Sequence, residues 1–144
     1  METCVYLFTG HYGSGKTETA VNFAIKLKNM GKNVALIDLD IVNPFFRSAD
    51  AKDLLEAQGI RVEIPLYANT NVDIPALTGA MGALIRDESY YIVLDVGGDD
   101  LGTKAVGRYS DDILSRKKYA QFFVVNPNRP FTKEIRSASE IYDA

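Results

Sequence analysis

The sequence predicts an α/β fold in which a doubly wound, mostly parallel sheet of about five strands carries helices on both faces. Apolar, strand-like runs alternate with segments of helical periodicity, an order typical of right-handed strand–helix–strand crossovers. The runs Val34–Ile37 and Tyr91–Leu94 show no polar alternation, as expected for strands covered on both faces. A glycine-rich loop joins the first run to the first helical segment. In such folds ligands bind at the carboxyl ends of the strands, so the residues that follow each strand are the candidate site residues.

The apolar runs place the strands at Val5–Thr9, Val34–Asp38, Arg61–Ile64, Tyr91–Asp95 and Gln121–Val125. Helical spacing places the helices at Glu18–Met30, Asp50–Gln58, Ile74–Arg86, Tyr109–Lys117 and Thr132–Tyr142. Gly31 stands where the first helix is expected to stop. The length of 144 residues indicates a single domain over residues 1–144. Because a helical pattern runs to Ala144, it stays open whether later elements of the sheet are missing.

The glycine-rich loop matches the phosphate-binding pattern G-x-x-x-x-G-K-[ST] in full. Gly10 and Gly15 allow backbone angles that let successive N–H groups face a polyanion. Lys16 adds a mobile positive charge, and Thr17 adds a hydroxyl for a metal ion at the start of a helix. The candidate nucleotide-binding residues of this loop are Gly10, His11, Tyr12, Gly13, Ser14, Gly15, Lys16 and Thr17. Their expected ligand is a nucleoside di- or triphosphate with Mg²⁺.

Carboxylates follow the second and fourth predicted strands. Asp40 is expected to orient water, accept its proton or hold Mg²⁺, with an ordinary turn after Asp38 as the alternative. Asp95 ends a buried apolar strand, where a carboxylate is costly without a partner, and Mg²⁺ is the natural partner. Gly98 follows three residues later and is expected to present its N–H to a γ-phosphate, with a plain Gly/Asp turn as the alternative.

Asn126 follows the fifth predicted strand, where its amide offers donors and acceptors to a purine base. A turn bracketed by prolines explains the same segment almost as well. Arg47 and Arg108 are candidates for stabilising transition-state charge, although ordinary surface or salt-bridging roles account for both.

Composition and charge limit the other functions. The net charge of −3 disfavours nucleic acid bound through a broad basic face. Cys4 is the only cysteine, which excludes an internal disulfide and a thiolate cage for zinc or an iron–sulfur cluster. No apolar run approaches the roughly 18 residues of a transmembrane segment, and no signal-peptide pattern precedes Val5. A cytoplasmic protein is therefore expected.

With these motifs in order, the chain resembles the MinD/ParA-type branch of P-loop ATPases. The resemblance rests on the loop Gly10–Thr17, on DLDIVNP at Asp38–Pro44, on DVGG at Asp95–Gly98 and on VVNP at Val124–Pro127. It implies phosphate and magnesium roles for Lys16 and Thr17 and a water-orienting role for Asp40. For Asp95 and Gly98 it implies the roles of the family's Walker B and switch II residues.

The chain departs from that family at His11. The family carries a lysine at this position, just after the first glycine, and that lysine reaches across a nucleotide-bound dimer. Histidine is shorter and largely neutral at pH 7, so it does not replace the charge of that lysine. The sequence therefore leaves undecided whether the protein forms a homodimer. The sequence lacks the Asn-Lys-x-Asp guanine motif, which favours ATP over GTP.

The leading interpretation is a Mg²⁺-dependent ATP-binding protein with slow ATP hydrolysis, in which Lys16 and Asp40 are catalytic. It would act as a nucleotide switch or energy source for an unidentified protein partner. One alternative is an ATP-dependent ligase or phosphoryl-transfer enzyme like the dethiobiotin synthetase and cobyrinic acid amidase relatives. Another is a non-catalytic nucleotide-binding module.

Overall fold

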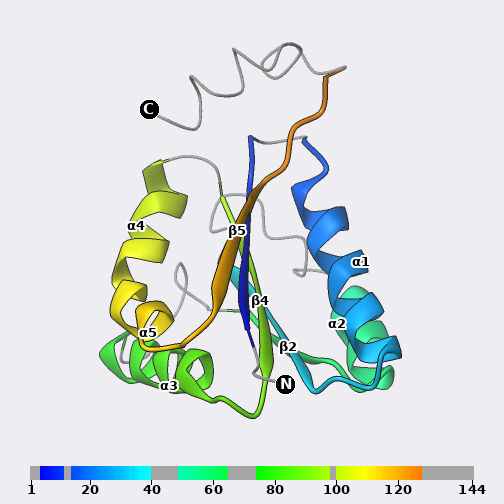
Figure 1. The fold of residues 1–144 in the computed structure, drawn as a ribbon, viewed down its shortest axis with the longest axis horizontal. Coiled ribbons are helices and arrows are strands. Elements are labelled where there is room, and N and C mark those ends of the chain that lie inside the picture. Colours follow the sequence, from blue (N-terminus) through cyan, green and yellow to red (C-terminus); the bar gives the residue numbers. More distant parts are fainter. Residues whose placement is uncertain (1–3, 12–13, 40–48, 65–73, 98–99, 128–144) are drawn as a thin grey trace.

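A parallel sheet of five strands forms the centre of the molecule (Figure 1). The computed structural model describes residues 4–11, 14–39, 49–64, 74–97 and 100–127. The strands are β1 Val5–Thr9, β2 Val34–Leu39, β3 Arg61–Glu63, β4 Tyr91–Val96 and β5 Tyr119–Phe123. Their order across the sheet is β3-β2-β4-β1-β5, and every neighbouring pair is parallel. The predicted α/β fold class is therefore confirmed.

Helices cover both faces of the sheet. The helices α1 Lys16–Asn29 and α2 Ala49–Ala57 lie on one face (Figure 1). The helices α3 Ile74–Arg86, α4 Asp100–Arg108 and α5 Ser110–Leu114 lie on the other. This division follows from right-handed crossovers, because α1 and α2 lead toward the β3 edge while α3 to α5 lead back toward β5. None of the helices in the described ranges has the length and apolar character that crossing a membrane requires.

The core consists of two apolar layers, one on each face. The layer beneath α3 to α5 includes Leu7, Ile37, Ile85, Leu94 and Tyr109. The layer beneath α1 and α2 includes Phe8, Ala24, Leu36, Val62 and Val93. All residues of β2 and β4 are buried, which confirms the expectation from their continuous apolar runs. These central strands hold the polar residues at their carboxyl ends in fixed positions.

Several predicted boundaries agree with the structure and others are wrong. Helix α3 matches its predicted range, and α1 ends at Asn29, with Gly31 in the left-handed conformation at a φ of 83°. Helix α4 was not predicted, because Gly102 and Gly107 lower the helical propensity of this segment. The expected helix Tyr109–Lys117 is the shorter α5, and the expected helix Thr132–Tyr142 lies outside the described residues.

Strand β5 begins and ends two residues earlier than predicted. It pairs residue for residue with β1, from Val5 with Tyr119 to Thr9 with Phe123. Among the described strands it forms one edge of the sheet, and its burial is lower than that of β4. Val124 adds one hydrogen bond from its N–H to the Thr9 carbonyl at 2.7 Å and is no longer part of the strand. Strand β5 thus ends opposite the last residue of β1.

Candidate functional site

The site lies where the chain leaves β1 and β4 at the carboxyl edge of the sheet. These strands are neighbours, and Phe8 of β1 is in register with Asp95 of β4. The helices that follow them, α1 and α4, lie on opposite faces of the sheet (Figure 1). Such a point, where successive connections diverge, is the usual ligand-binding crevice of an open α/β sheet.

The loop between β1 and α1 is held by backbone hydrogen bonds. The N–H of Ser14 donates to the His11 carbonyl at 3.0 Å. Gly15 precedes the first residue of α1 with a φ of 90°, a conformation that other residues rarely adopt, as the loop pattern predicted. The Gly15 carbonyl accepts hydrogen bonds from the backbone N–H and from the Oγ1 atom of Thr19, at 3.0 and 2.8 Å. The first turn of α1 is thereby fixed to the loop.

Gly10 is required for a different reason from the one predicted. Its φ is not positive, so the expectation of a special backbone angle at this position is wrong. A Cβ atom on Gly10 would lie 2.6 Å from the Val124 carbonyl oxygen and 2.7 Å from the Ser14 Oγ atom. The backbone that follows β5 therefore packs directly against the start of the loop. Only a residue without a side chain fits between them.

The side chains of Lys16 and Thr17 both contact the carboxylate of Asp95. The Lys16 Nζ atom lies 2.5 Å from Oδ1, and the Thr17 Oγ1 atom donates to Oδ2 at 2.8 Å. The side chains of Lys16 and Asp95 are only 5% and 0% exposed. The ammonium group offsets the cost of burying the carboxylate. The structure thus brings together three predicted site residues from two distant parts of the chain.

A second carboxylate lies beside the first. Asp38 of β2 is in register with Asp95 and is 2% exposed. Alternation along the strands places both residues on the α1 face, together with Leu36 and Val93. Two adjacent buried carboxylates require positive charge nearby, and Lys16 supplies it to Asp95. The sequence analysis singled out Asp95 as a metal ligand but did not predict that the carboxylate of Asp38 lies beside it.

The residues present fit a magnesium-bound nucleotide. Thr17 and Asp95 offer hydroxyl and carboxylate oxygens, the ligands that Mg²⁺ prefers. The described ranges hold no group of three or more His, Cys, Asp or Glu side chains arranged for a metal ion. Mg²⁺ commonly takes one or two protein ligands and completes its shell with phosphates and water. The buried Ser14 Oγ atom, which has no hydrogen-bond partner within the described part of the chain, lies in the same loop.

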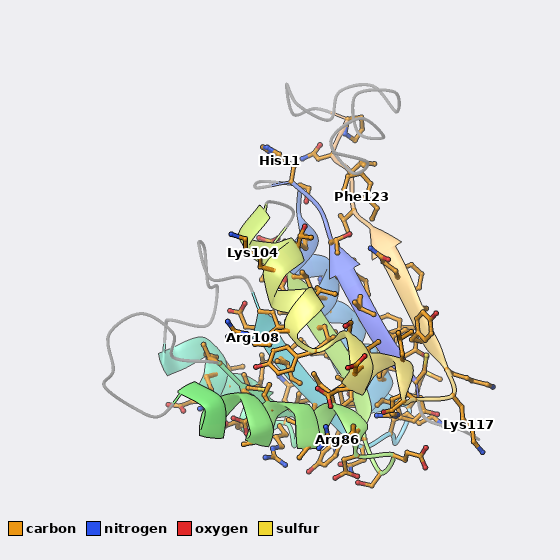
Figure 2. The ribbon with its side chains drawn as sticks, turned by 90° about the vertical axis from the view of Figure 1, so that its left-hand side faces the viewer. His11, Arg86, Lys104, Arg108, Lys117 and Phe123 are labelled. Carbon is orange, nitrogen blue, oxygen red and sulfur yellow. The ribbon has the colours of Figure 1, made fainter. Side chains whose placement is uncertain are left out.

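Three other candidates lie outside this contact. His11 is half-buried at the start of the loop, and Figure 2 shows it at the opposite end of the molecule from Arg86 and Lys117. Asn126 is half-buried and lies two residues after Val124, whose backbone carbonyl packs against Gly10 of the loop. Arg108 is exposed at the end of α4.

Five of the predicted candidates lie outside the described residues, namely Tyr12, Gly13, Asp40, Arg47 and Gly98.

The contact of Val124 with Gly10 was missed by the sequence interpretation. It depends on the register of β5 against β1, for which the sequence carries no local signal.

Two solved structures of similar fold are nucleotide complexes. The structure of FlhF complexed with GTP/Mg(2+) has a TM-score of 0.61 at 16% identity and is matched over 99% of this chain and 51% of that chain. A nucleotide-binding protein from Archaeoglobus fulgidus, in complex with ADP and with Co, has a TM-score of 0.52 at 14% identity. That match covers 98% of this chain and 61% of the other. At these identities the likeness shows the fold alone, and the chain spans about half of the FlhF chain.

A comparison of the sequence with curated proteins found no significant match. The model of the CobQ/CobB/MinD/ParA nucleotide binding domain, CbiA, matches residues 7–135. This range includes the loop, all five strands except the first residues of β1, and both buried carboxylates. The chain therefore belongs to the CobQ/CobB/MinD/ParA family of P-loop nucleotide-binding domains.

Proposed function

We propose that the protein binds ATP with Mg²⁺, hydrolyses it slowly and acts as a nucleotide switch or energy source for a protein partner. The observation that carries this proposal is the contact of Lys16 and Thr17 with Asp95 at the carboxyl ends of β1 and β4. These groups have the charge and the oxygen ligands that a magnesium-bound polyphosphate needs. Family membership supports nucleotide binding in general.

Each residue has a distinct role in this proposal. The backbone N–H groups at the start of α1 and the ammonium of Lys16 neutralise the phosphates. Thr17 and Asp95 hold Mg²⁺, which stabilises charge on the phosphate oxygens when bound. Asp40 orients the attacking water, and Gly98 responds to the loss of the γ-phosphate. Asn126 contacts the base.

The choice of ATP rests on the sequence, which lacks the Asn-Lys-x-Asp guanine motif. The similar structures contain GTP in one case and ADP in the other, so both bases belong in the test. The role as a switch or energy source is proposed for the whole protein. The match covers only 51% and 61% of these two chains, so their full length is not represented here.

A nucleotide panel tests the proposal. ATP, ADP, GTP and GDP are added with and without Mg²⁺, and both thermal stability and phosphate release are followed. A nucleotide at a hundredfold excess over its dissociation constant should stabilise the fold by about 2.7 kcal/mol. Lys16→Ala should abolish that increment, while Lys52→Ala, on the exposed side of α2, should keep it.

The outcomes separate the interpretations. An unchanged ATP-induced increment in Lys16→Ala would contradict the loop assignment. Binding without any phosphate release would favour a non-catalytic module. Stronger stabilisation by GTP than by ATP would overturn the choice of base.

A second candidate function is an ATP-dependent ligase or phosphoryl-transfer enzyme. The observation in its favour is the family description itself, which joins CobQ and CobB with MinD and ParA. In this case a small acceptor molecule, instead of water, attacks the phosphate. A metabolite panel that raises ATP turnover well above the background rate would support the enzyme, and the absence of any such metabolite effect would favour the switch.

A further inference from the structure

The carboxylate of Asp95 contacts the two side chains that the proposed function assigns to the ligand. Oδ1 contacts the Lys16 ammonium and Oδ2 accepts the Thr17 hydroxyl. The pair is buried, with Asp95 0% and Lys16 5% exposed. In this arrangement the charge of Lys16 is directed at Asp95, and the charge of Asp95 is directed at Lys16.

We propose that the Lys16–Asp95 ion pair is an internal competitor of the nucleotide, which makes phosphate and metal binding depend on each other. The inference rests on the proposed function and adds a rule for how its ligands bind. Breaking a buried ion pair by removing one partner is costly because the other charge is left uncompensated. Phosphate alone draws Lys16 away from Asp95, and a metal ion alone draws Asp95 away from Lys16. Each ligand by itself therefore weakens the compensation of one charge of this buried pair.

The competition predicts that neither ligand binds well without the other. It also predicts that removing one charge of the pair strengthens the binding of the ligand that the remaining charge attracts. Asp95→Asn retains the shape of the side chain but removes the negative charge that competes for Lys16, so metal-free nucleotide should bind more tightly. Lys16→Met removes the positive charge that competes for Asp95, so a divalent cation alone should bind more tightly.

Calorimetric titration of the 144-residue chain with ADP and with GDP tests the first half. In EDTA, Asp95→Asn should bind its preferred diphosphate at least about tenfold more tightly than the wild type, a gain of about 1.4 kcal/mol. The wild type should gain affinity strongly when Mg²⁺ is added, and the variant only slightly. Asp112→Asn provides the matched control, because Asp112 forms its ion pair with Arg86 between α5 and α3, away from the loop. It should follow the wild type in both buffers.

Electron paramagnetic resonance of Mn²⁺ tests the second half without nucleotide. Mn²⁺ should bind Lys16→Met more tightly than the wild type or Lys52→Met. This measurement also decides the proposal if Asp95→Asn does not fold.

The proposal is overturned if Asp95→Asn binds metal-free diphosphate no better than the wild type, or if Lys16→Met gains no affinity for Mn²⁺. A wild type that binds neither diphosphate in the presence of Mg²⁺ would instead contradict the proposed function itself. The two failures are therefore distinguishable in one set of titrations.

Discussion

The Nζ atom of Lys16 lies 2.5 Å from the Oδ1 atom of Asp95, although 79 positions separate the two residues. The parallel pairing of β1 with β4 brings them together, because Phe8 and Asp95 are in register and the loop turns back over the ends of both strands. The contact joins the phosphate-binding loop to the carboxylate that was predicted as a metal ligand. Four further changes test how this site and its supporting structure are held together.

Thr17 is expected to contribute to metal binding through its hydroxyl group, which now donates to Asp95 at 2.8 Å. Thr17→Val retains the volume of the side chain but removes the oxygen. It should reduce the Mg²⁺-induced gain in nucleotide affinity by at least about tenfold, since ligand oxygens are required for that gain. Thr17→Ser retains the hydroxyl and should behave like the wild type. Calorimetric titrations at several Mg²⁺ concentrations measure the difference, and equal affinities for the Val and Ser variants would contradict the assignment.

Gly10→Ala is expected to destabilise the fold and to weaken nucleotide binding. The added Cβ would lie 2.6 Å from the Val124 carbonyl, so the backbone after β5 or the loop must move. Overpacking of this kind costs about 1–3 kcal/mol. Gly79→Ala is the control, because Gly79 lies within α3 with no neighbouring atom within 4 Å of the added group. It should stabilise the protein by up to about 1 kcal/mol. Urea unfolding of both variants checks the signs, and similar effects would contradict the steric argument.

Arg116 is expected to be essential for stability at the end of the sheet opposite the site. It is 3% exposed and donates to the carbonyls of Ile85, Asp87 and Tyr90 at 2.8, 3.1 and 2.9 Å. Burial lowers the pKa of its guanidinium, which nevertheless stays charged near neutral pH. Arg116→Met removes these donors and should cost about 2–3 kcal/mol in urea unfolding. The exposed Lys117→Met should change stability by less than about 0.5 kcal/mol, and a comparable loss there would contradict this role.

Tyr6 is expected to make the fold sensitive to alkaline pH. Burial, followed by the neighbouring Cys4, raises the pKa of the Tyr6 hydroxyl from 10.0 to about 12. Below pH 10 the hydroxyl is protonated in both folded and unfolded chains. Between about pH 10 and 12 the unfolded chain loses the proton more readily, so stability falls as the pH rises.

Tyr6→Phe should lose less stability than the wild type across this window. The ring contacts of Tyr6 with Phe23 and Phe122, at centroid distances of 4.7 and 6.4 Å, remain available to phenylalanine. Urea unfolding at pH 8 and pH 11 measures the difference, with the exposed Tyr119→Phe as the matched control. An unchanged pH dependence in Tyr6→Phe would show that another group is responsible.

Much of the fold was predictable because its signals are local. The unbroken apolar runs of β2 and β4 predicted strands buried on both faces, and both strands are buried throughout. Gly15 adopts the left-handed conformation that the loop pattern requires. Helix α4 was missed because its two glycines weaken the local signal, although Val106 packs against the core beneath α3 to α5.

The alternation of strands and helices, the phosphate-binding loop and the carboxylates near the strand ends were all predictable from the amino-acid sequence. These features depend on residue type and short-range spacing. Two contacts were not predictable in this way, namely that of Lys16 and Thr17 with the Asp95 carboxylate and that of Gly10 with Val124. Those contacts depend on the order β4-β1-β5 and on strand register. Both are set by burial over the whole sheet, so no single segment of the sequence predicts them.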